Sequence, residues 1–500
     1  MLALLDSATL VGVDSHPVRV EVDVTAGVPN YTLVGLPDAS AAESRERVQG
    51  ALRNSGYALS SRRVTVNLAP GEIRKEGPRF DLAIALGILA SETGKPVVRP
   101  AQLKELMVLG ELALDGAVRP VRGVLSSVLL ARRMGLSRVM VPLANGPEAA
   151  LVSGLRVLAV RDLREAVEVA SGRESSAPVL PEPAGQEPAG VDLEVVRGQH
   201  LARRALEICA AGGHHLLFVG PPGSGKTLLA RCLPSVLPPL SQEEALEVTR
   251  IHSAQRRVNI LQGLSRTPPF RDPAQSVSLA GLIGSFTPGE ISLAHRGVLF
   301  LDEFPEFRRD CLEALRAPLE DGSVSVARAG FHASYPCRFT LVAAMNPCPC
   351  GYYGDPVREC ACSPIQRERY FHRLSGPLLD RIDLQVRVPR PEPEELLSRQ
   401  PGEPSAAVRE RVMRAVAIQY ERGCRNAELG PAQTRRFCVL DTESRGFLLQ
   451  ALRRRSLSAR VHDRVLRLAR TLADLEGHER IGIQEVCEAM EYRALEGEDY

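Results

Sequence analysis

The chain has 500 residues, enough for roughly two to four domains with large cores. Its 62 basic and 60 acidic residues nearly cancel, so no global field selects a charged partner and any nucleic-acid surface must be local. No apolar run approaches the ~20 residues of a membrane helix, and the first residues lack the basic region of a signal peptide. Eleven cysteines, four of them clustered, fit a reducing compartment better than a disulfide framework. The composition therefore predicts a cytoplasmic protein without a membrane partner.

Residues 1–172 predict a mixed α/β domain. Apolar periodicity predicts strands at Val18–Val24, Arg63–Leu68 and Arg138–Pro142, and helices at Ala41–Leu52, Asp81–Ala90 and Val124–Met134. The segment Gly110–Gly116 resembles a strand that ends in an Asp-Gly turn. Residues 173–191 are rich in Ser, Pro, Glu, Ala and Gly, a composition typical of a flexible linker.

Two further domains are expected after the linker. Residues 192–390 predict a second α/β domain, and Pro389–Pro393 marks its end. Residues 391–500 are expected to be mostly helical. The strongest helical pattern of that domain is Ser458–Glu476, whose apolar residues recur at spacings of four and three.

A nucleotide-binding motif follows the apolar run His215–Val219. It reads Gly220-Pro221-Pro222-Gly223-Ser224-Gly225-Lys226-Thr227 and opens onto the apolar segment Leu228–Leu233. Strand, glycine-rich loop and helix are the context in which this motif binds phosphates, because the glycines let successive N–H groups turn inward. Lys226 is expected to reach the β- and γ-phosphates of ATP, and the Thr227 hydroxyl to bind Mg²⁺. Lys226 is also one of only four lysines in the chain.

Two more apolar runs end in polar side chains. The run Gly297–Leu301 leads into Asp302 and Glu303, and Arg338–Met345 leads into Asn346. Open α/β sheets bind ligands at the carboxyl ends of their strands, so Asp302 predicts an outer Mg²⁺ ligand and Glu303 the base that polarises the attacking water. Asn346 is expected to hold that water near the γ-phosphate. A solvated acidic turn is the alternative for the two carboxylates.

These three strand-end sites resemble the Walker A, Walker B and sensor 1 motifs of AAA+ ATPases. Longer stretches resemble the magnesium-chelatase-like AAA+ group, and more narrowly its ComM/YifB family: Pro288–His295, Asn346–Gly351 and Gly376–Leu384. The resemblance extends over nearly the whole chain. It implies a homo-hexameric ATPase that acts as a DNA helicase and promotes branch migration in recombination during natural transformation.

The resemblance also assigns roles to arginines. Carried over by position, Arg381 is the arginine finger, which stabilises transition-state charge on the neighbouring subunit's nucleotide. An ion pair with Asp380 or Asp383 is the alternative for Arg381. Arg460 corresponds to sensor 2, which contacts the nucleotide from the C-terminal domain, and Arg464 is a second candidate for that role.

Two insertions of this AAA+ branch bear on DNA. Leu282–Ala294 corresponds to the helix-2 insert, and Val324–Pro336 to a hairpin with Arg328 near its tip. Such hairpins line the pore of related helicases and hold DNA phosphates, whereas an ordinary surface hairpin is the alternative. The chain has Pro273–Ser276, Pro-Ala-Gln-Ser, where the family has Pro-His-His-Ser, so the role of the paired histidines is in doubt here.

Four cysteines fall within fifteen positions of one Gly/Pro-rich loop: Cys348, Cys350, Cys360 and Cys362. Thiolates suit tetrahedral Zn²⁺, and a structural metal site would hold this irregular loop together. The spacing is Cys-x-Cys, whereas zinc sites more often use Cys-x₂-Cys. Two interpretations stay open, a structural Zn²⁺ site or reduced cysteines packed in the loop.

The segments Lys75–Asp81 and Gly110–Pro142 resemble the proteolytic domain of Lon, a ribosomal-S5-like fold. Lon carries its nucleophile where this chain has Arg79, and its lysine within the stretch that reads Val124 to Ser127 here. Without a nucleophile or a base, Ser–Lys acyl chemistry is excluded on this alignment, so no protease activity is expected. The resemblance implies a non-catalytic binding or assembly domain.

The sequence thus predicts an α/β protein in which ATP and Mg²⁺ drive a hexamer along branched or single-stranded DNA. The alternative is a magnesium-chelatase-type ATPase that remodels a protein or a metal-insertion complex. The fused N-terminal domain favours the first interpretation, because the chelatase ATPase subunit typically lacks it.

Overall fold

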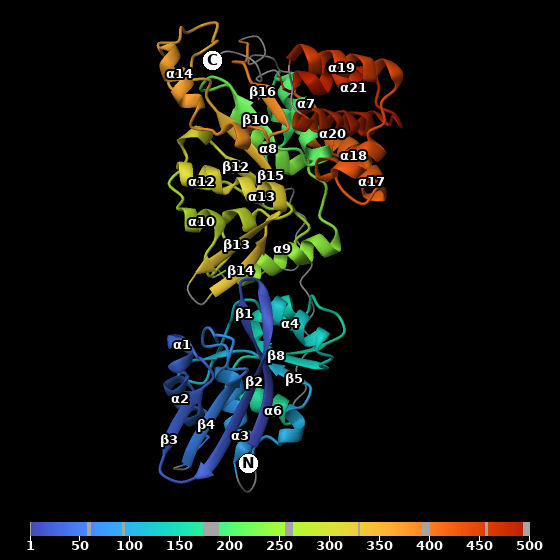
Figure 1. Cartoon of the computed structure of the whole chain (residues 1–500). Helices are drawn as coiled ribbons and strands as arrows, with labels where there is room; N and C mark the ends of the chain where they lie inside the picture. The colour runs from blue at the N-terminus through green and yellow to red at the C-terminus, as the bar shows by residue number, and fades with distance from the viewer. Residues whose placement is uncertain are drawn as a thin grey trace.

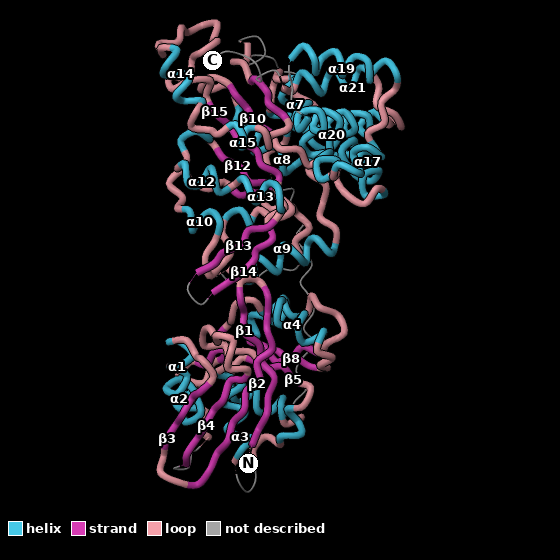
Figure 2. The backbone as a smooth tube through the Cα atoms, in the orientation of Figure 1, coloured by secondary structure: helices cyan, strands magenta, loops and turns pink. Residues whose placement is uncertain are grey.

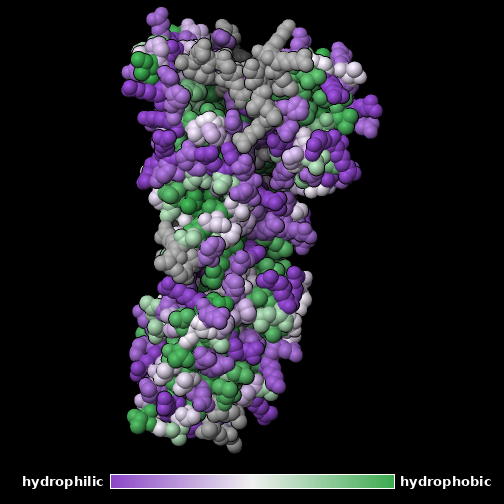
Figure 3. Space-filling model, in the orientation of Figure 1, coloured by the Kyte–Doolittle hydropathy of each residue, from purple (hydrophilic) through white to green (hydrophobic). Residues whose placement is uncertain are grey.

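The computed structural model describes residues 2–57, 62–92, 96–173, 190–255, 264–328, 331–392, 401–455 and 459–493, without the side chains of residues 328, 331, 452–455, 459 and 460. The molecule is elongated, with the N-terminal sheet at one end and the second sheet and the C-terminal helices at the other (Figure 1). On the face shown in Figure 3, hydrophobic and hydrophilic residues are interspersed. Along the described ranges, no helix has an apolar stretch long enough to cross a lipid bilayer.

In the described N-terminal part, seven strands form one sheet in the order β3-β4-β2-β1-β5-β8-β9. The strands are β1 (Leu2–Val11), β2 (Asp14–Ala26), β3 (Asn30–Val34), β4 (Arg62–Ala69), β5 (Leu106–Val108), β8 (Arg138–Pro142) and β9 (Arg156–Val160). The strands β6 (Glu111–Leu112) and β7 (Val118–Arg119) form a separate hairpin. The helices are α1 (Ala39–Ala42), α2 (Ser44–Asn54), α3 (Asp81–Ser91), α4 (Val124–Arg133), α5 (Gly146–Ala149) and α6 (Leu163–Ala170). Every residue of α3 is buried, so this helix forms the centre of the N-terminal core.

The second sheet is parallel and, among the described residues, has the strand order β11-β12-β15-β10-β16. Its strands are β10 (Leu216–Val219), β11 (Phe270–Arg271), β12 (Val298–Leu301), β15 (Thr340–Met345) and β16 (Leu384–Arg387). The larger helices around it are α7 (His200–Gly212), α8 (Lys226–Val236), α9 (Gln242–Ala254) and α14 (Pro364–Phe371). Shorter helices are α10 (Leu279–Ile283), α11 (Glu290–Leu293), α12 (Arg309–Ala314), α13 (Arg316–Asp321) and α15 (Gly376–Leu379). The strands β13 (Ser323–Arg328) and β14 (Phe331–Pro336) project as an antiparallel hairpin (Figure 2).

The C-terminal part is helical, as the sequence predicts. It contains α17 (Ser405–Glu421), α18 (Pro431–Phe437), α19 (Thr442–Arg455), α20 (Ala459–Glu476) and α21 (Ile483–Glu491). The apolar stripe of α20 is buried at Val461, Val465, Leu468 and Leu472, in one core with Phe218 of β10. Truncating a buried leucine of this stripe to alanine would cost about 2–5 kcal/mol.

Most expected elements of the N-terminal domain are confirmed, and two differ. The helix expected at Ala41–Leu52 begins earlier, at the Asp38 cap, and is broken at Glu43 into α1 and α2. The strand expected over Gly110–Gly116 is only the two residues of β6, because Gly116 turns the chain at a φ of +91°.

The turn between β1 and β2 contacts the second α/β domain. Val13 is buried against Ile251 and Ala254 of α9 and against Tyr335 of β14. Gly12 has a φ of +65°, and a Cβ atom there would lie 2.8 Å from the Cβ of Ala333. The N-terminal domain is therefore seated on α9 and on the base of the β13–β14 hairpin (Figure 1).

Candidate active site

The phosphate loop connects β10 to α8 and requires glycine at three positions. Gly223 and Gly225 have φ angles of +78° and +91°, in the left-handed region that glycine adopts without steric cost. Gly220 lies so close to the chain after β16 that a Cβ atom there would meet the Val388 carbonyl oxygen at 2.1 Å. Only glycine therefore lets the loop curl at the end of β10.

Lys226 is buried at the start of α8. Its Nζ donates to the carbonyl oxygens of Gly220 at 2.7 Å and Pro221 at 2.9 Å, and to Asn346 Oδ1 at 3.3 Å. Burial lowers the pKa of Lys226 to about 8, while the charges of Asp302 and Glu303 act in the opposite direction. In the same loop, the buried Ser224 hydroxyl has no hydrogen-bond partner among the described residues. The loop thus offers a cation and an unused hydroxyl group, both of which suit a phosphate.

Oxygen ligands lie at the adjoining strand end. Thr227 Oγ1 donates to Asp302 Oδ2 at 2.8 Å, so the end of β12 meets the first turn of α8. Asp302 also accepts the backbone N–H of Glu303 at 2.9 Å. Hydroxyl and carboxylate oxygens are ligands that Mg²⁺ uses beside nucleotide phosphates. The residues present therefore fit a Mg²⁺–nucleotide complex, with Lys226 and the loop for its phosphates and Thr227 and Asp302 for its metal.

Glu303 has an unusual backbone. Its φ is +54°, and a left-handed conformation at a residue other than glycine costs of order 1–3 kcal/mol and clusters at functional sites. The side chain is exposed, and its carboxylate accepts a hydrogen bond from Nε2 of Gln275. Sequence reasoning missed Gln275 as a site residue, although its position where the family resemblance predicts a histidine was a signal.

Arg381 follows α15 and is largely buried, with 12% of its side chain exposed. Its Nη1 donates to the Pro377 carbonyl oxygen and its Nη2 pairs with Glu320, each at 2.6 Å. The sequence offered an ion pair of Arg381 with Asp380 or Asp383 as the alternative. Arg381 does form an ion pair, but its partner is Glu320. Glu320 comes from α13, 61 positions away, and no local pattern points to it.

Arg381 also lines a cavity of about 970 Å³ between the second sheet and the C-terminal helices. The cavity lies at the amino ends of the parallel strands, since His215 precedes β10, Gly297 precedes β12 and Thr340 begins β15. The phosphate loop follows the opposite, carboxyl end of β10. Five residue steps from His215 to Gly220 span roughly 16 Å at ~3.3 Å per residue. Arg381 and the phosphate loop of one chain therefore lie at opposite ends of the sheet.

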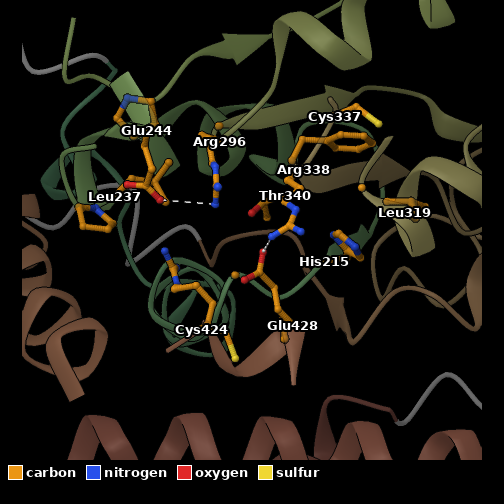
Figure 4. Close-up of a pocket in the computed structure, with 18 of the residues that line it drawn as sticks. His215, Leu237, Glu244, Arg296, Leu319, Cys337, Arg338, Thr340, Cys424 and Glu428 are labelled. Atoms are coloured by element: carbon orange, nitrogen blue, oxygen red, sulfur yellow. Dashed lines mark ion pairs between the residues drawn. The ribbon is translucent and has the colours of Figure 1, made fainter. Parts of the chain in front are cut away.

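Charged side chains from several elements line the same cavity. Figure 4 shows Arg296 paired with Glu244 and Arg338 with Glu428, at 3.5 and 3.9 Å. These pairs join α9 and the C-terminal domain to loops that precede strands of the sheet.

Arg464 lies at this cavity too. Its Nη1 is 3.8 Å from Asp383 Oδ1, and burial lowers its pKa. His214, Arg464 and Arg467 together hold the pKa of Asp383 far below its usual range, despite the burial that raises it. Arg460 is part of α20, but its side chain lies outside the described residues, so its role stays a prediction.

The β13–β14 hairpin confirms the expected hairpin over Val324–Pro336. Arg328 pairs with Phe331 at its tip, in register with the rest of the two strands. The Arg328 side chain is outside the described residues, and its contact with DNA stays a prediction. The expected insert over Leu282–Ala294 contains the end of α10, a tight turn and α11.

The four clustered cysteines do converge. The Sγ atoms of Cys348, Cys350, Cys360 and Cys362 all lie within 4.8 Å of one another. Their loop connects β15, which ends beside Asn346, to α14.

The Lon-like segments contain buried basic residues. Arg79, at the position of the Lon nucleophile, donates to the Arg122 carbonyl oxygen at 2.5 Å, and burial lowers its pKa to about 10. Lys75 donates to the Pro70 carbonyl oxygen. In the stretch where Lon has its lysine, Ser126 donates to the Val13 carbonyl oxygen at 2.7 Å. These side chains hold the turn and loops of the domain together.

Three family models match the chain. The model described as magnesium chelatase, subunit ChlI, matches residues 192–396, and the model of the ChlI C-terminal region matches residues 402–493. A further model, subunit ChlI of Mg-chelatase, matches residues 20–145.

Two of the curated relatives match over nearly their full length, and a third matches over a short segment. The chain is 42% identical to the uncharacterized protein YifB of Escherichia coli, over 99% of this chain and 97% of that protein. It is 42% identical to competence protein ComM of Haemophilus influenzae, over 99% of this chain and 98% of the relative. A Lon protease of Salinispora arenicola is 32% identical over 136 residues, which cover 26% of this chain and 17% of the protease.

Proposed function

We propose, from the premise that this chain belongs to the ComM/YifB family of magnesium-chelatase-like AAA+ ATPases, that it is a ring-forming DNA motor driven by ATP. The family implies an ATPase that uses ATP and Mg²⁺. The finer proposal is a homo-hexameric helicase that promotes branch migration in homologous recombination or natural transformation.

The nucleotide would be held by one chain's loop and strand ends. Lys226 and the inward N–H groups of Gly220 to Thr227 would bind the phosphates, and Thr227 and Asp302 would bind Mg²⁺. ATP supplies a phosphoanhydride bond whose hydrolysis releases the free energy for movement. Glu303 would accept a proton from the attacking water, and Asn346 would orient that water, because its amide lies 3.3 Å from Lys226 Nζ.

One observation carries the ring proposal. Arg381 lies at the amino ends of the strands whose carboxyl ends hold Lys226, Asp302 and Asn346. A guanidinium there is about a strand length from its own phosphate loop, so it can serve only a nucleotide bound to another copy of the chain. Arg464, the second candidate for sensor 2, lines the same cavity. Head-to-tail contacts of this kind close into rings when the rotation permits.

The DNA proposal rests on the hairpin and on the relatives. In a ring, β13 and β14 would project toward the central channel, and Arg328 at their tip would contact phosphates. Competence protein ComM is matched over 98% of its length, including the N-terminal domain, which favours a DNA motor over a chelatase-type remodelling ATPase. A motor on chromosomal DNA would work in the cytoplasm.

The test measures ATP hydrolysis by the full chain with and without forked DNA or Holliday junctions. Stimulation by these DNAs is expected, with little stimulation in Arg328→Ala. Glu303→Gln should retain ATP and hydrolyse it about 10²–10⁴-fold more slowly. Glu306→Gln, which changes another carboxylate near the same strand end, is the control and should hydrolyse ATP at nearly the wild-type rate. If DNA neither binds nor stimulates while Glu303→Gln still traps ATP, the DNA-motor proposal fails.

A further inference from the structure

The loop from Asn346 to Ser363 brings four thiols to one point. Cys348 Sγ lies 3.3 Å from Cys350 Sγ and 3.6 Å from Cys360 Sγ, and Cys350 Sγ lies 3.6 Å from Cys360 Sγ. A tetrahedron of thiolates about 2.3 Å from a Zn²⁺ ion has sulfur–sulfur distances of about 3.8 Å. The observed spacings are close to that value and far from the ~2.05 Å of a disulfide. The geometry therefore fits one tetrahedral metal ion.

The backbone supports thiolates in the same cluster. The Cys350 N–H donates to Cys362 Sγ and the Cys362 N–H donates to Cys360 Sγ, each at 3.4 Å. Such N–H···S bonds orient the ligands of a metal site and stabilise their negative charge.

The loop is only partly buried. Of its cysteines, only Cys348 is fully buried, and the other three are partly exposed. Its other contacts include surface stacks, with the Arg358 guanidinium 4.1 Å from the Tyr352 ring centre and Arg367 4.0 Å from that of Tyr353. Asp355 also pairs with Arg390 at 3.3 Å and accepts the Val357 N–H at 2.8 Å. A metal ion would cross-link this partly exposed loop and favour one conformation of it.

This loop is seated on the nucleotide site. Gly351 has a φ of +86°, and a Cβ atom there would lie 2.7 Å from Cδ of Pro222 in the phosphate loop. The Gly351 N–H donates to the Cys348 carbonyl oxygen at 3.0 Å. This hydrogen bond connects the Gly351–Pro222 contact to the first cysteine of the cluster. Asn346, two residues before Cys348, accepts from Lys226. The cysteine cluster thus lies within a few residues of both contacts that the loop makes with the phosphate loop, Gly351 with Pro222 and Asn346 with Lys226.

We propose that Cys348, Cys350, Cys360 and Cys362 bind one Zn²⁺ ion, and that this ion holds Gly351 against Pro222 and so positions the phosphate loop and Asn346. Each cysteine binds as a thiolate and releases its proton, without a change of oxidation state. The positioning role rests on the ATPase of the proposed function, whereas the metal site does not.

The first measurement is the metal content of the full chain, purified without chelator and supplied with Zn²⁺. About one zinc per chain is expected, and Cys360→Ser/Cys362→Ser should lose it. Cys424→Ser/Cys487→Ser, which removes two partly exposed thiols outside the cluster, should keep it. Absence of zinc from the wild type, iron in its place, or disulfides among the four cysteines would overturn the site.

A second pair of variants tests the positioning role. Cys360→Ser/Cys362→Ser is expected to lower kcat for ATP roughly tenfold, the range found when supporting groups of metal sites are removed. Gly351→Ala should keep its zinc yet lower kcat, since the added Cβ displaces the loop from Pro222. Normal kcat in the zinc-free variant, with circular dichroism unchanged, would overturn the positioning role. A wild type that binds zinc but hydrolyses no ATP would count against the motor and leave the metal site standing.

Discussion

The Gln275 amide donates a hydrogen bond to the Glu303 carboxylate. Both side chains are exposed, and Glu303 is held in a left-handed conformation at the end of β12. Gln275 lies 28 positions before Glu303, in the place where the family resemblance predicts a histidine. This contact gives Gln275 a positioning role toward the proposed base, with a neutral amide in place of a titratable ring.

Gln275→Ala is expected to lower kcat for ATP roughly tenfold and to leave KM nearly unchanged, because a misplaced base slows chemistry and not binding. Gln275→His should restore most of the rate and add a dependence on pH near 6.5, where imidazole takes up a proton. Steady-state rates between pH 5.5 and 8 check both variants. Ser276→Ala, an exposed neighbour, is the control. Equal rates in Gln275→Ala and the wild type would exclude the role.

Arg381 and Glu303 predict a test by mixing. Each of Arg381→Ala and Glu303→Gln alone should hydrolyse little ATP, since an arginine finger contributes ~10³–10⁵ in rate in other NTPases. In a mixed ring, a Glu303→Gln chain still presents Arg381 to a neighbour that has Glu303. Activity should therefore reappear on mixing and peak near equal amounts of the two variants. If the mixtures stay inactive while size measurements show mixed rings, Arg381 does not act on the nucleotide of a neighbouring chain.

Much of this site could be predicted because its motifs are local. Asp302 and Asn346 directly follow apolar strands, and Lys226 and Thr227 begin the helix that the phosphate loop joins to β10. Parallel strands bring such ends together. The neighbouring partners could not be predicted in the same way. Glu320 reaches Arg381 from another helix across 61 positions, and its contact depends on tertiary packing.

The N-terminal sheet shows the same limit. The strand β4 was expected from its alternating pattern, which the one-sided burial of its side chains explains. No strand was expected at β1, because Leu2 and Leu4 are exposed apolar residues that obscure any alternation. The central strand β1 was thus missed, whereas its neighbour β2 and the next strand, β4, were predicted.

Lys226 predicts a pH dependence of nucleotide binding. Its folded-state pKa of about 8 is below the model-peptide value, so this group favours the folded state increasingly as pH rises from about 8 toward 10.5. Phosphate binding requires the protonated ammonium, so ADP should bind about tenfold more weakly at pH 9 than at pH 7.5 and take up a proton. Calorimetry in two buffers of different ionisation enthalpy measures that uptake. Lys226→Arg, which stays charged, should bind independently of pH over this range, and a flat wild-type affinity would contradict the prediction.

Arg250 predicts how firmly the N-terminal domain is attached. From α9, its Nε donates to the Val13 carbonyl oxygen and to Ser126 Oγ, each at 3.2 Å, and its Nη2 pairs with Asp14. Arg250→Ala should speed amide exchange in the β1–β2 turn and the start of α4 roughly tenfold, since hydrogen bonds to charged groups contribute about 1.5–3 kcal/mol. ATP hydrolysis without DNA should persist, because the hydrogen bonds of the Arg250 side chain are with the N-terminal domain. Arg133 is an exposed arginine of α4, so Arg133→Ala should change neither amide exchange nor ATP hydrolysis. Unchanged amide exchange in Arg250→Ala would show that the apolar contacts of Val13 are enough to attach the N-terminal domain.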